Sequence, residues 1–286
     1  MVKPTFAVVG AQKSATTWLF ECLNEHPEIF TPALKEVHYF CRPEDCRLSR
    51  RQSGEPWYDE LFEPGPYKAW GELTTDYMFF PYIADDLYKY NPEMKIVFLL
   101  RNPVDRAYSA YWMWRRHKAD LPPFADMLEK EPAFVERGLY HRQIMPYIER
   151  FGAERVRIYV YEEIVTQPES FLGDLFSFLG VDPAFRPKSQ DQTVGATAEY
   201  GKGAGFLVYK VLSPIINLPF ILPAWRWLRA NTNLRDRLLS LIAKRSESSG
   251  YSAISPQDRQ QLLERFRAEN ARLFTLLDRD IPAWNQ

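Results

Sequence analysis

The sequence predicts an α/β fold in which a central parallel sheet is flanked by helices. Short apolar runs that are typical of buried strands alternate with helical segments along the first two thirds of the chain. Two of these runs, residues 5–10 and 95–100, are each followed closely by the start of a helix. Strands that alternate with helices run parallel, and ligands then bind outside their carboxyl ends.

The remaining elements follow from apolar periodicity and from residues that start or stop helices. The predicted strands or strand edges lie in residues 5–10, 35–40, 68–80, 95–100 and 156–164. The predicted helices cover residues 16–27, 102–117, 168–181 and a C-terminal segment from Pro256. Gly10 and Pro27 end the first strand and the first helix. Asn102 and Pro103 start the second helix, and Gly180 ends the third.

The C-terminal helix has a clear start signal and one apolar face. Ser255 is its predicted N-cap, Pro256 its first residue, and Asp258 adds an acid to the first turn. The apolar face consists of Leu262, Leu263, Phe266, Leu273, Phe274 and Leu277. We expect this helix to be structural, as part of a C-terminal helical lid.

The composition is that of an ordinary globular protein. Among 286 residues, 46% are apolar and 26% are charged, and the net charge is −1. Such a balance disfavours nucleic acid or another polyanion as a partner. No signal peptide precedes the first strand, which predicts a cytoplasmic location. Cys41 and Cys46 could bind zinc, but no second pair completes a site, so we expect reduced thiols and no metal.

The last third of the chain differs in composition, although we expect residues 1–286 to form a single domain. Residues 183–205 are rich in proline, glycine and small polar residues and predict a long loop. Residues 206–228 are apolar but contain two basic residues and three prolines. Three hypotheses apply to this segment: a hairpin that packs on the protein or covers the acceptor pocket, a peripheral membrane contact, or a membrane span, for which it is poorly suited.

The first predicted anion site is the loop "GAQKSATTW" between the first strand and its helix. Such a loop presents free backbone N–H groups, and the helix dipole favours a negative ligand. The loop adds a cation and hydroxyl donors, namely Lys13, Ser14, Thr16 and Thr17. It is tighter than a Walker loop and lacks the second glycine. The alternative is a surface lysine beside an ordinary helix cap.

The second predicted anion site is "FLLRNPVDRAYSAYW". Arg101 follows a buried strand, and Ser109 lies two turns into the next helix. A guanidinium and a hydroxyl could hold a phosphate there. The alternative is a structural ion pair that involves Arg101 with Asp105 or Arg106. A kinase or GTPase would want a magnesium-binding aspartate at this strand end, and the chain has Leu100 and Arg101 instead.

Together these two segments resemble the sulfotransferases that use 3′-phosphoadenosine 5′-phosphosulfate (PAPS). "AQKSATTWL" is similar to the family's phosphosulfate loop, with Ala15 in place of a glycine, and "FLLRNPVDRAYSAYW" is similar to its 3′-phosphate segment. The likeness runs from about residue 5 to about residue 182. It implies a P-loop-like fold, PAPS as cofactor, adenosine 3′,5′-bisphosphate (PAP) as product, and no metal. It also implies that Lys13 acts in catalysis and in cofactor binding, that Trp18 stacks on the adenine, and that Tyr161 lies near the base or phosphate.

"LKEVHYF" supplies the candidates for a catalytic base. A carboxylate or imidazole must take the acceptor's proton. On a strand, Glu36 and His38 would share one face, and both could point into one site. The segment resembles the K-E-x-H-[YF]-F stretch of the glycan-modifying branch, which implies Glu36 as base and His38 as assistant. His38 as sole base, or as a merely structural histidine, stays open.

The chain also departs from the glycan-modifying branch. "GELTTDY" has Leu73 where that branch often has a lysine, which disfavours a sulfated polysaccharide as acceptor. Thr74, Asp76 and Tyr77 remain candidates for lining the acceptor pocket. "EYGKGAG" is a weak candidate for the family's last cofactor loop, with Lys202 and Gly203 on a phosphate.

The sequence therefore predicts a sulfotransferase that acts on a hydroxyl or amine of a small or lipophilic acceptor. The apolar segment 206–228 is the reason to expect a lipophilic one. Two other classes stay open. One is a small-molecule kinase that uses ATP and magnesium, for which no metal-binding carboxylate is evident. The other is a non-catalytic relative that binds nucleotide or docks on a membrane.

Overall fold

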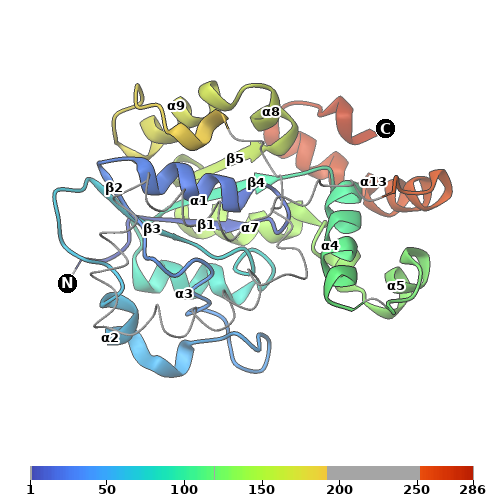
Figure 1. The fold of residues 1–286 in the computed structure, drawn as a ribbon, viewed down its shortest axis with the longest axis horizontal. Coiled ribbons are helices and arrows are strands. Elements are labelled where there is room, and N and C mark those ends of the chain that lie inside the picture. The colour runs from blue at the N-terminus through green and yellow to red at the C-terminus, as the bar shows by residue number, and fades with distance from the viewer. Residues whose placement is uncertain (1, 119, 192–251, 286) are drawn as a thin grey trace, which may run out of the picture. The chain divides into compact units, whose positions relative to one another are not determined.

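The structure is a computed structural model that describes residues 2–118, 120–191 and 252–285. Within these residues, five parallel strands form a sheet in the order β2-β3-β1-β4-β5 (Figure 1). The strands are β1 (Phe6–Gly10), β2 (Ile29–Phe30), β3 (Ala69–Leu73), β4 (Lys95–Leu100) and β5 (Val156–Val160). This confirms the predicted α/β fold with a central parallel sheet.

Helices lie on both sides of the sheet in Figure 1. The α-helices of the described residues are α1 (Thr16–Glu25), α2 (Gly54–Asp59), α3 (Tyr82–Tyr90), α4 (Pro103–His117), α5 (Phe124–Lys130), α6 (Ala133–Glu136), α7 (Tyr140–Phe151), α8 (Tyr161–Thr166), α9 (Pro168–Leu179) and α13 (Pro256–Leu277). Short 3₁₀ turns are η1 (Arg51–Ser53), η2 (Ala153–Arg155), η3 (Lys188–Asp191) and η4 (Pro282–Asn285).

The alternation of side chains along β1 explains why its whole sequence is apolar. Phe6 and Val8 pack with residues of α1 and α9 in one core cluster. Ala7 and Val9 pack with residues of α3 and α7 in another. Successive residues of a strand face opposite sides of the sheet, so a strand covered on both sides is apolar throughout.

Three helix ends confirm the signals expected there. The Asn102 side chain accepts a hydrogen bond from the Val104 N–H at the start of α4. Gly180 caps α9 in the left-handed conformation with φ 82°. The Ser255 side chain accepts from the Asp258 N–H at the start of α13. Each residue type offers the hydroxyl, amide or positive φ that such a helix end requires.

Two expected strands are wrong in whole or in part. Residues 35–40 form no strand, and the edge of the sheet next to β3 is occupied by the two-residue β2 instead. The run 156–164 is a strand only as far as Val160, after which α8 begins at Tyr161. The second difference moves Tyr161 from a strand to a helix N-terminus at the edge of the sheet where ligands are expected.

The strand order places the switch point of the sheet between β1 and β4. From β1 the chain moves toward β3 and β2, whereas from β4 it moves toward β5. Ligands of open parallel sheets bind outside the carboxyl ends of the strands at such a point. Lys13 and Arg101 follow these two strand ends.

Candidate functional site

The loop after β1 has the backbone of an anion-binding turn. Lys13 has φ 74°, and Ala15, the N-cap of α1, has φ 63° and ψ 17°. This left-handed region costs a non-glycine residue about 1–2 kcal/mol. Ala15 therefore adopts the conformation for which glycine is preferred. The expectation that alanine can take up the loop's backbone angles is confirmed.

Ser14 provides the local test of whether an anion fits this loop. Its side chain is fully buried, and its Oγ has no hydrogen-bond partner. A buried hydroxyl without a partner costs about 1–3 kcal/mol. It lies just before α1, a ten-residue helix whose first N–H groups also need acceptors. A phosphate oxygen would satisfy both, so the residues fit the predicted ligand.

Arg101 brings the second predicted segment to the first. Its Nη1 donates to the Lys13 carbonyl oxygen at 3.2 Å. Its guanidinium lies 4.7 Å from the ring centroid of Tyr161. The Arg101 carbonyl in turn accepts a hydrogen bond of 2.8 Å from the Tyr140 hydroxyl. Two cationic residues that are 88 positions apart in the chain thus meet at the carboxyl ends of β1 and β4.

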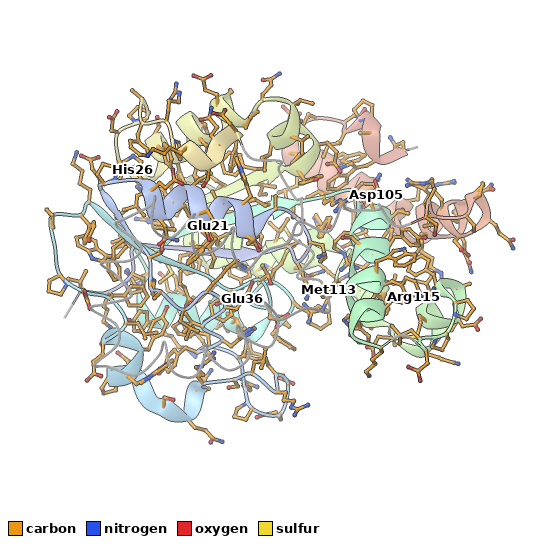
Figure 2. The ribbon with its side chains drawn as sticks, viewed as in Figure 1. Glu21, His26, Glu36, Asp105, Met113 and Arg115 are labelled. Carbon is orange, nitrogen blue, oxygen red and sulfur yellow. The ribbon has the colours of Figure 1, made fainter. Side chains whose placement is uncertain are left out.

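The hypothesis of an ion pair between Arg101 and Asp105 is not supported. Asp105 lies near the start of α4 (Figure 2). Its Oδ1 is 2.5 Å from Nη2 of Arg259 on α13. Arg106 is fully buried and donates to the Phe134 carbonyl. Arg101 is instead directed to the Lys13 loop, and its anion-binding role stays a prediction.

The other predicted cofactor residues have varied environments. Thr16 and Ser109 are buried at 6% exposure each, while Thr17 is exposed. Trp18 is also 6% exposed, and its Nε1 donates to the Ser189 carbonyl at 2.9 Å. The ring is thus almost wholly covered in this structure, and little of it is open to an adenine. Its stacking role stays a prediction that this geometry disfavours. Lys202 and Gly203 lie outside the described residues.

The segment that carries Glu36 and His38 is a turn held by the loop after β3. Both residues have positive φ, 58° and 53°. The Glu36 N–H donates to the Leu73 carbonyl at 2.9 Å, and the N–H groups of Val37 and His38 donate to Thr74 Oγ1 at 3.0 and 3.4 Å. The argument that a strand gives the two side chains a common face is therefore wrong, and their direction is set by this turn.

Glu36 is held at a partly exposed position. Its carboxylate accepts hydrogen bonds from the Thr75 N–H at 2.8 Å and from the Thr75 hydroxyl at 3.2 Å. Lys35 Nζ lies 2.7 Å from its Oε1. The Glu36 side chain is 29% exposed, and so it can still meet a bound molecule. Its role as a base stays a prediction.

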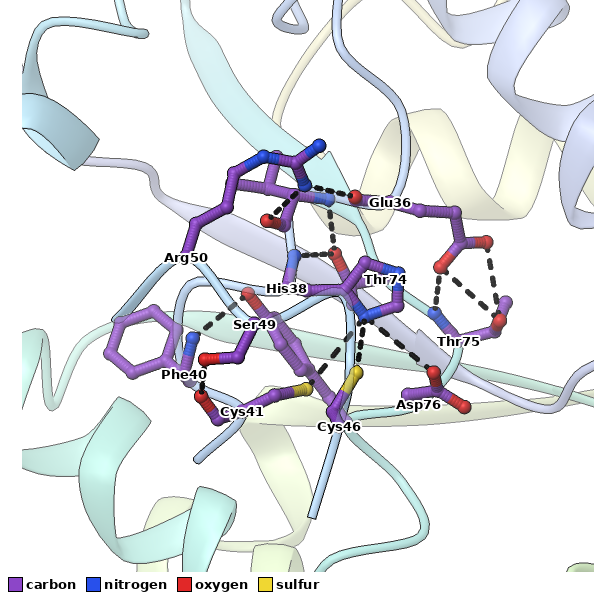
Figure 3. A network of polar contacts seen from close by, with 12 residues as sticks. Glu36, His38, Phe40, Cys41, Cys46, Ser49, Arg50, Thr74, Thr75 and Asp76 are labelled. Carbon is purple, nitrogen blue, oxygen red and sulfur yellow. Dashed lines mark hydrogen bonds and ion pairs between the residues drawn. The ribbon is translucent and has the colours of Figure 1, made fainter. Parts of the chain in front are cut away.

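His38 lies deeper, beside acidic and sulfur-containing side chains (Figure 3). The residue is 3% exposed, and burial lowers its pKa. Its Nδ1 is 3.5 Å from Oδ2 of Asp76, 3.8 Å from Cys41 Sγ and 3.7 Å from Cys46 Sγ. Asp76 Oδ1 pairs with Arg137 Nη1 at 2.6 Å. The second ring nitrogen of His38 is turned away from the thiols in Figure 3.

Glu72 supports this region, although the sequence did not single it out as a functional residue. It is 1% exposed at the end of β3 and accepts hydrogen bonds from the hydroxyls of Tyr58, Thr74 and Tyr77 at 2.5, 2.7 and 3.0 Å. Because Thr74 also accepts from Val37 and His38, Glu72 anchors the turn that presents Glu36. The sequence feature that could have identified Glu72 is a carboxylate within an apolar strand pattern, at the second position of "GELTTDY".

We expect Glu72 to make the stability of the fold depend on pH. Burial raises its pKa from 4.5 to about 7 despite the three hydroxyl donors. The folded state then holds the proton more tightly, so stability is complete below about pH 4.5 and falls as the pH rises through about 7. Relative to Glu72→Gln, the wild type should lose about 3 kcal/mol of unfolding free energy over this range, at about 1.4 kcal/mol per pKa unit.

Urea unfolding of both proteins from about pH 4.5 to about pH 7.5 checks this prediction, since the pH dependence that remains in Glu72→Gln reports all other groups. An equal pH dependence in the two proteins would show that the hydroxyl donors cancel the effect of burial on the pKa of Glu72.

The comparison with known families agrees with this geometry. A family model described as the sulfotransferase domain matches residues 3–194, which is more than half of the chain. The chain belongs to the sulfotransferase family. The predicted family, reaction class and PAPS cofactor are thereby confirmed at the level of the family, and the kinase hypothesis loses its basis.

Solved structures of other sulfotransferases share the fold. The sulfotransferase from Alicyclobacillus acidocaldarius has a TM-score of 0.74 and 26% sequence identity, and the match covers 100% of both chains. Mouse sulfotransferase SULT7A1, solved in complex with PAP, has a TM-score of 0.52 at 16% identity over 93% of this chain and 83% of that chain. The second likeness supports the fold alone.

Curated relatives match over part of their length. The membrane-associated sulfotransferase kil1 of Dictyostelium discoideum is 32% identical over 143 residues, which are 46% of this chain and 29% of kil1. Human heparan sulfate glucosamine 3-O-sulfotransferase 3B1 is 22% identical over 191 residues, which are 62% of this chain and 46% of that protein. The chain thus spans less than half the length of either relative.

In the part of the chain that the structure describes, no helix combines the length and the apolar character needed to cross a bilayer. The segment 206–228 lies outside the described residues, and its three hypotheses stay open.

Proposed function

We propose that the protein transfers the sulfuryl group of PAPS to a hydroxyl or amine of a small or lipophilic acceptor and releases PAP. The observation that supports this most directly is that the two segments predicted to bind anions meet at the switch point of the sheet. Arg101 Nη1 bonds the Lys13 carbonyl at 3.2 Å, so the ligands proposed for the two ends of one nucleotide lie on adjoining loops.

The residues at this edge fit a nucleotide that carries phosphate at both ends. Lys13, the unsatisfied Ser14 hydroxyl and the N-terminus of α1 would hold the 5′-phosphosulfate. Arg101 and Ser109 would hold the 3′-phosphate, with Tyr161 against the Arg101 guanidinium. When bound, PAPS supplies the sulfuryl group and a phosphate leaving group.

Lys13 and the N–H groups that begin α1 would stabilise the charge that develops on the leaving phosphate. Fixed dipoles and cations aimed at a developing charge are the usual source of large rate effects. The loop's left-handed residues fix these donors before any ligand arrives, which limits the cost of reorganisation. This role needs no metal-binding carboxylate at the end of β4.

Glu36 is the proposed base. It would take the proton of the acceptor hydroxyl or amine as the acceptor attacks, so the proton ends on a carboxylate oxygen. Thr75 orients this carboxylate with two donors, while the side chain keeps partial access to solvent. His38 is the alternative base or an assistant, and its second ring nitrogen is the one available for that task.

The acceptor is proposed to be small or lipophilic. Leu73 replaces the lysine that the glycan-modifying branch often has, and the net charge of −1 offers no broad cationic surface for a sulfated chain. The relatives named for heparan sulfate share only part of their length with this chain. A polysaccharide acceptor is the alternative that an acceptor screen would reveal.

A thermal-shift titration with PAP tests the proposal, with ATP and magnesium as the comparison. PAP at about 100 times its Kd should add about 2.7 kcal/mol of stability, and added magnesium should change nothing. Arg101→Ala is expected to weaken PAP binding at least about tenfold, since a charged hydrogen bond is worth about 1.5–3 kcal/mol. The exposed Lys89→Ala serves as the control.

A shift with ATP and magnesium but none with PAP would contradict the proposed function. Unchanged PAP affinity in Arg101→Ala would leave the function standing but remove the 3′-phosphate role of Arg101.

A further inference from the structure

Two thiols and an imidazole converge beside the proposed base, and the transfer chemistry uses neither thiol. Cys41 Sγ and Cys46 Sγ lie 3.8 and 3.7 Å from Nδ1 of His38. The three ligand atoms all lie within 4.8 Å of one another, and all three residues are buried (Figure 3). All three cysteines of the chain are free thiols in the structure.

Hydrogen bonds that do not involve the sulfur atoms hold the backbone around these side chains. The Cys46 N–H donates to the Arg42 carbonyl at 3.0 Å, which closes a turn between the two cysteines. The Ser49 hydroxyl donates to the Cys41 carbonyl. Thr74 Oγ1 accepts from the His38 N–H at 3.4 Å. The cluster is therefore organised in advance by the fold around it.

The two nitrogen–sulfur distances are close to those between ligands of one tetrahedral zinc ion. Bonds of about 2.3 Å to sulfur and about 2.05 Å to nitrogen put a sulfur and a nitrogen about 3.6 Å apart. The two observed distances from nitrogen to sulfur are 3.8 and 3.7 Å. A thiol–imidazole contact of this length can also be a weak hydrogen bond. Nδ1 has only one N–H or one lone pair, however, and it cannot form two well-aligned hydrogen bonds with the two thiols at once.

We propose that His38 Nδ1, Cys41 Sγ and Cys46 Sγ form a binding site for a zinc ion. Two thiolates and one imidazole are a ligand set that suits zinc. Asp76 Oδ2, 3.5 Å from the same nitrogen, is the candidate for the fourth position. Arg137 holds the other Asp76 oxygen at 2.6 Å and so orients the carboxylate.

A metal here would tie together two segments that are distant in sequence. His38 and the cysteines belong to the 36–46 segment, and Asp76 belongs to the loop after β3. Glu36 lies two residues before His38 and is bonded to Thr75, one residue before Asp76. The ion would thus fix the position of the proposed base. The second nitrogen of His38 would then carry the imidazole proton, so that a metal-bound His38 could donate a hydrogen bond but not act as the base.

Metal analysis of the full chain tests this proposal without any activity assay. The protein purified under reducing conditions is expected to carry about one zinc per chain. After chelation, cobalt titrated into the unaltered protein should produce the thiolate-to-cobalt charge-transfer absorption of a tetrahedral site. Cys41→Ala and Cys46→Ala should each lower metal affinity at least about 100-fold, since loss of an outer-shell partner alone costs about 10–100-fold.

Cys22→Ala is the matched control, because Cys22 is a buried free thiol of α1 that packs in a different core cluster. This variant is expected to leave metal binding unchanged. The absence of zinc and of a cobalt spectrum in the unaltered protein would overturn the proposal. So would a Cys41–Cys46 disulfide in that protein, or equal metal affinity in all three variants. The cobalt spectrum of the unaltered chain does not depend on whether a variant folds.

Discussion

Lys13→Ala is expected to lower kcat by more than about 100-fold, because it removes a cation aimed at the charge of the leaving phosphate. A factor of 100 corresponds to about 2.7 kcal/mol of transition-state stabilisation. Lys13 lies in the loop between β1 and α1 with φ 74°, beside the buried Ser14. The residue thus stands in the loop that leads to the helix N-terminus where the phosphosulfate is proposed to bind.

PAP formation in the presence of PAPS and the best acceptor from a screen of phenols, alcohols and amines measures this effect. The Lys13 side chain is partly exposed, so the Lys13→Ala variant should fold. The control is Lys89→Ala, which removes one positive charge from the exposed face of α3. The affinity for PAP should change less than kcat, because the product carries no reacting group. Equal losses in PAP affinity and in kcat/KM, with kcat unchanged, would instead make Lys13 a simple binding residue.

The fold was predictable where a single local signal fixes a boundary. Gly10 ends β1, Asn102 caps α4 and Gly180 caps α9, and each does so through its own backbone or side chain. Residues 35–40 have a strand-like pattern, but the edge of the sheet is taken by β2, and Glu36 and His38 adopt positive φ. Which segment pairs with β3 depends on long-range packing, which a local pattern does not contain.

The proposed nucleotide side of the site was more predictable than the proposed acceptor side. Parallel strands bring their carboxyl ends to one edge, so the sequence alone could place Lys13 and Arg101 at the same edge of the sheet. No comparable rule brings Thr75 to Glu36 or Arg137 to Asp76, since these contacts join separate loops. The close spacing of His38, Cys41 and Cys46 in the sequence could have indicated the thiol cluster. The zinc pattern considered from the sequence consists of two pairs of cysteines, and so it leaves out the histidine.

Glu36→Gln is expected to lower kcat by more than about 100-fold while PAP affinity stays the same, because general-base catalysis contributes about 10²–10⁴-fold. The glutamine keeps the size of the side chain and an oxygen for the Thr75 donors, so the turn at residues 36–38 should hold its shape. It cannot accept the acceptor's proton. The loss should therefore appear in turnover, measured as PAP formation at saturating PAPS.

Glu44→Gln is the control for this substitution, because Glu44 is an exposed carboxylate on the same segment and should turn over at the wild-type rate. A Glu36→Gln variant that keeps nearly full rate with an alcohol acceptor would assign the base to His38, whose second ring nitrogen faces away from the thiols. Full rate with an amine but not with an alcohol would show that a neutral amine loses its proton after attack without help from the protein. The two acceptor classes therefore separate a missing base from a base that the acceptor makes unnecessary.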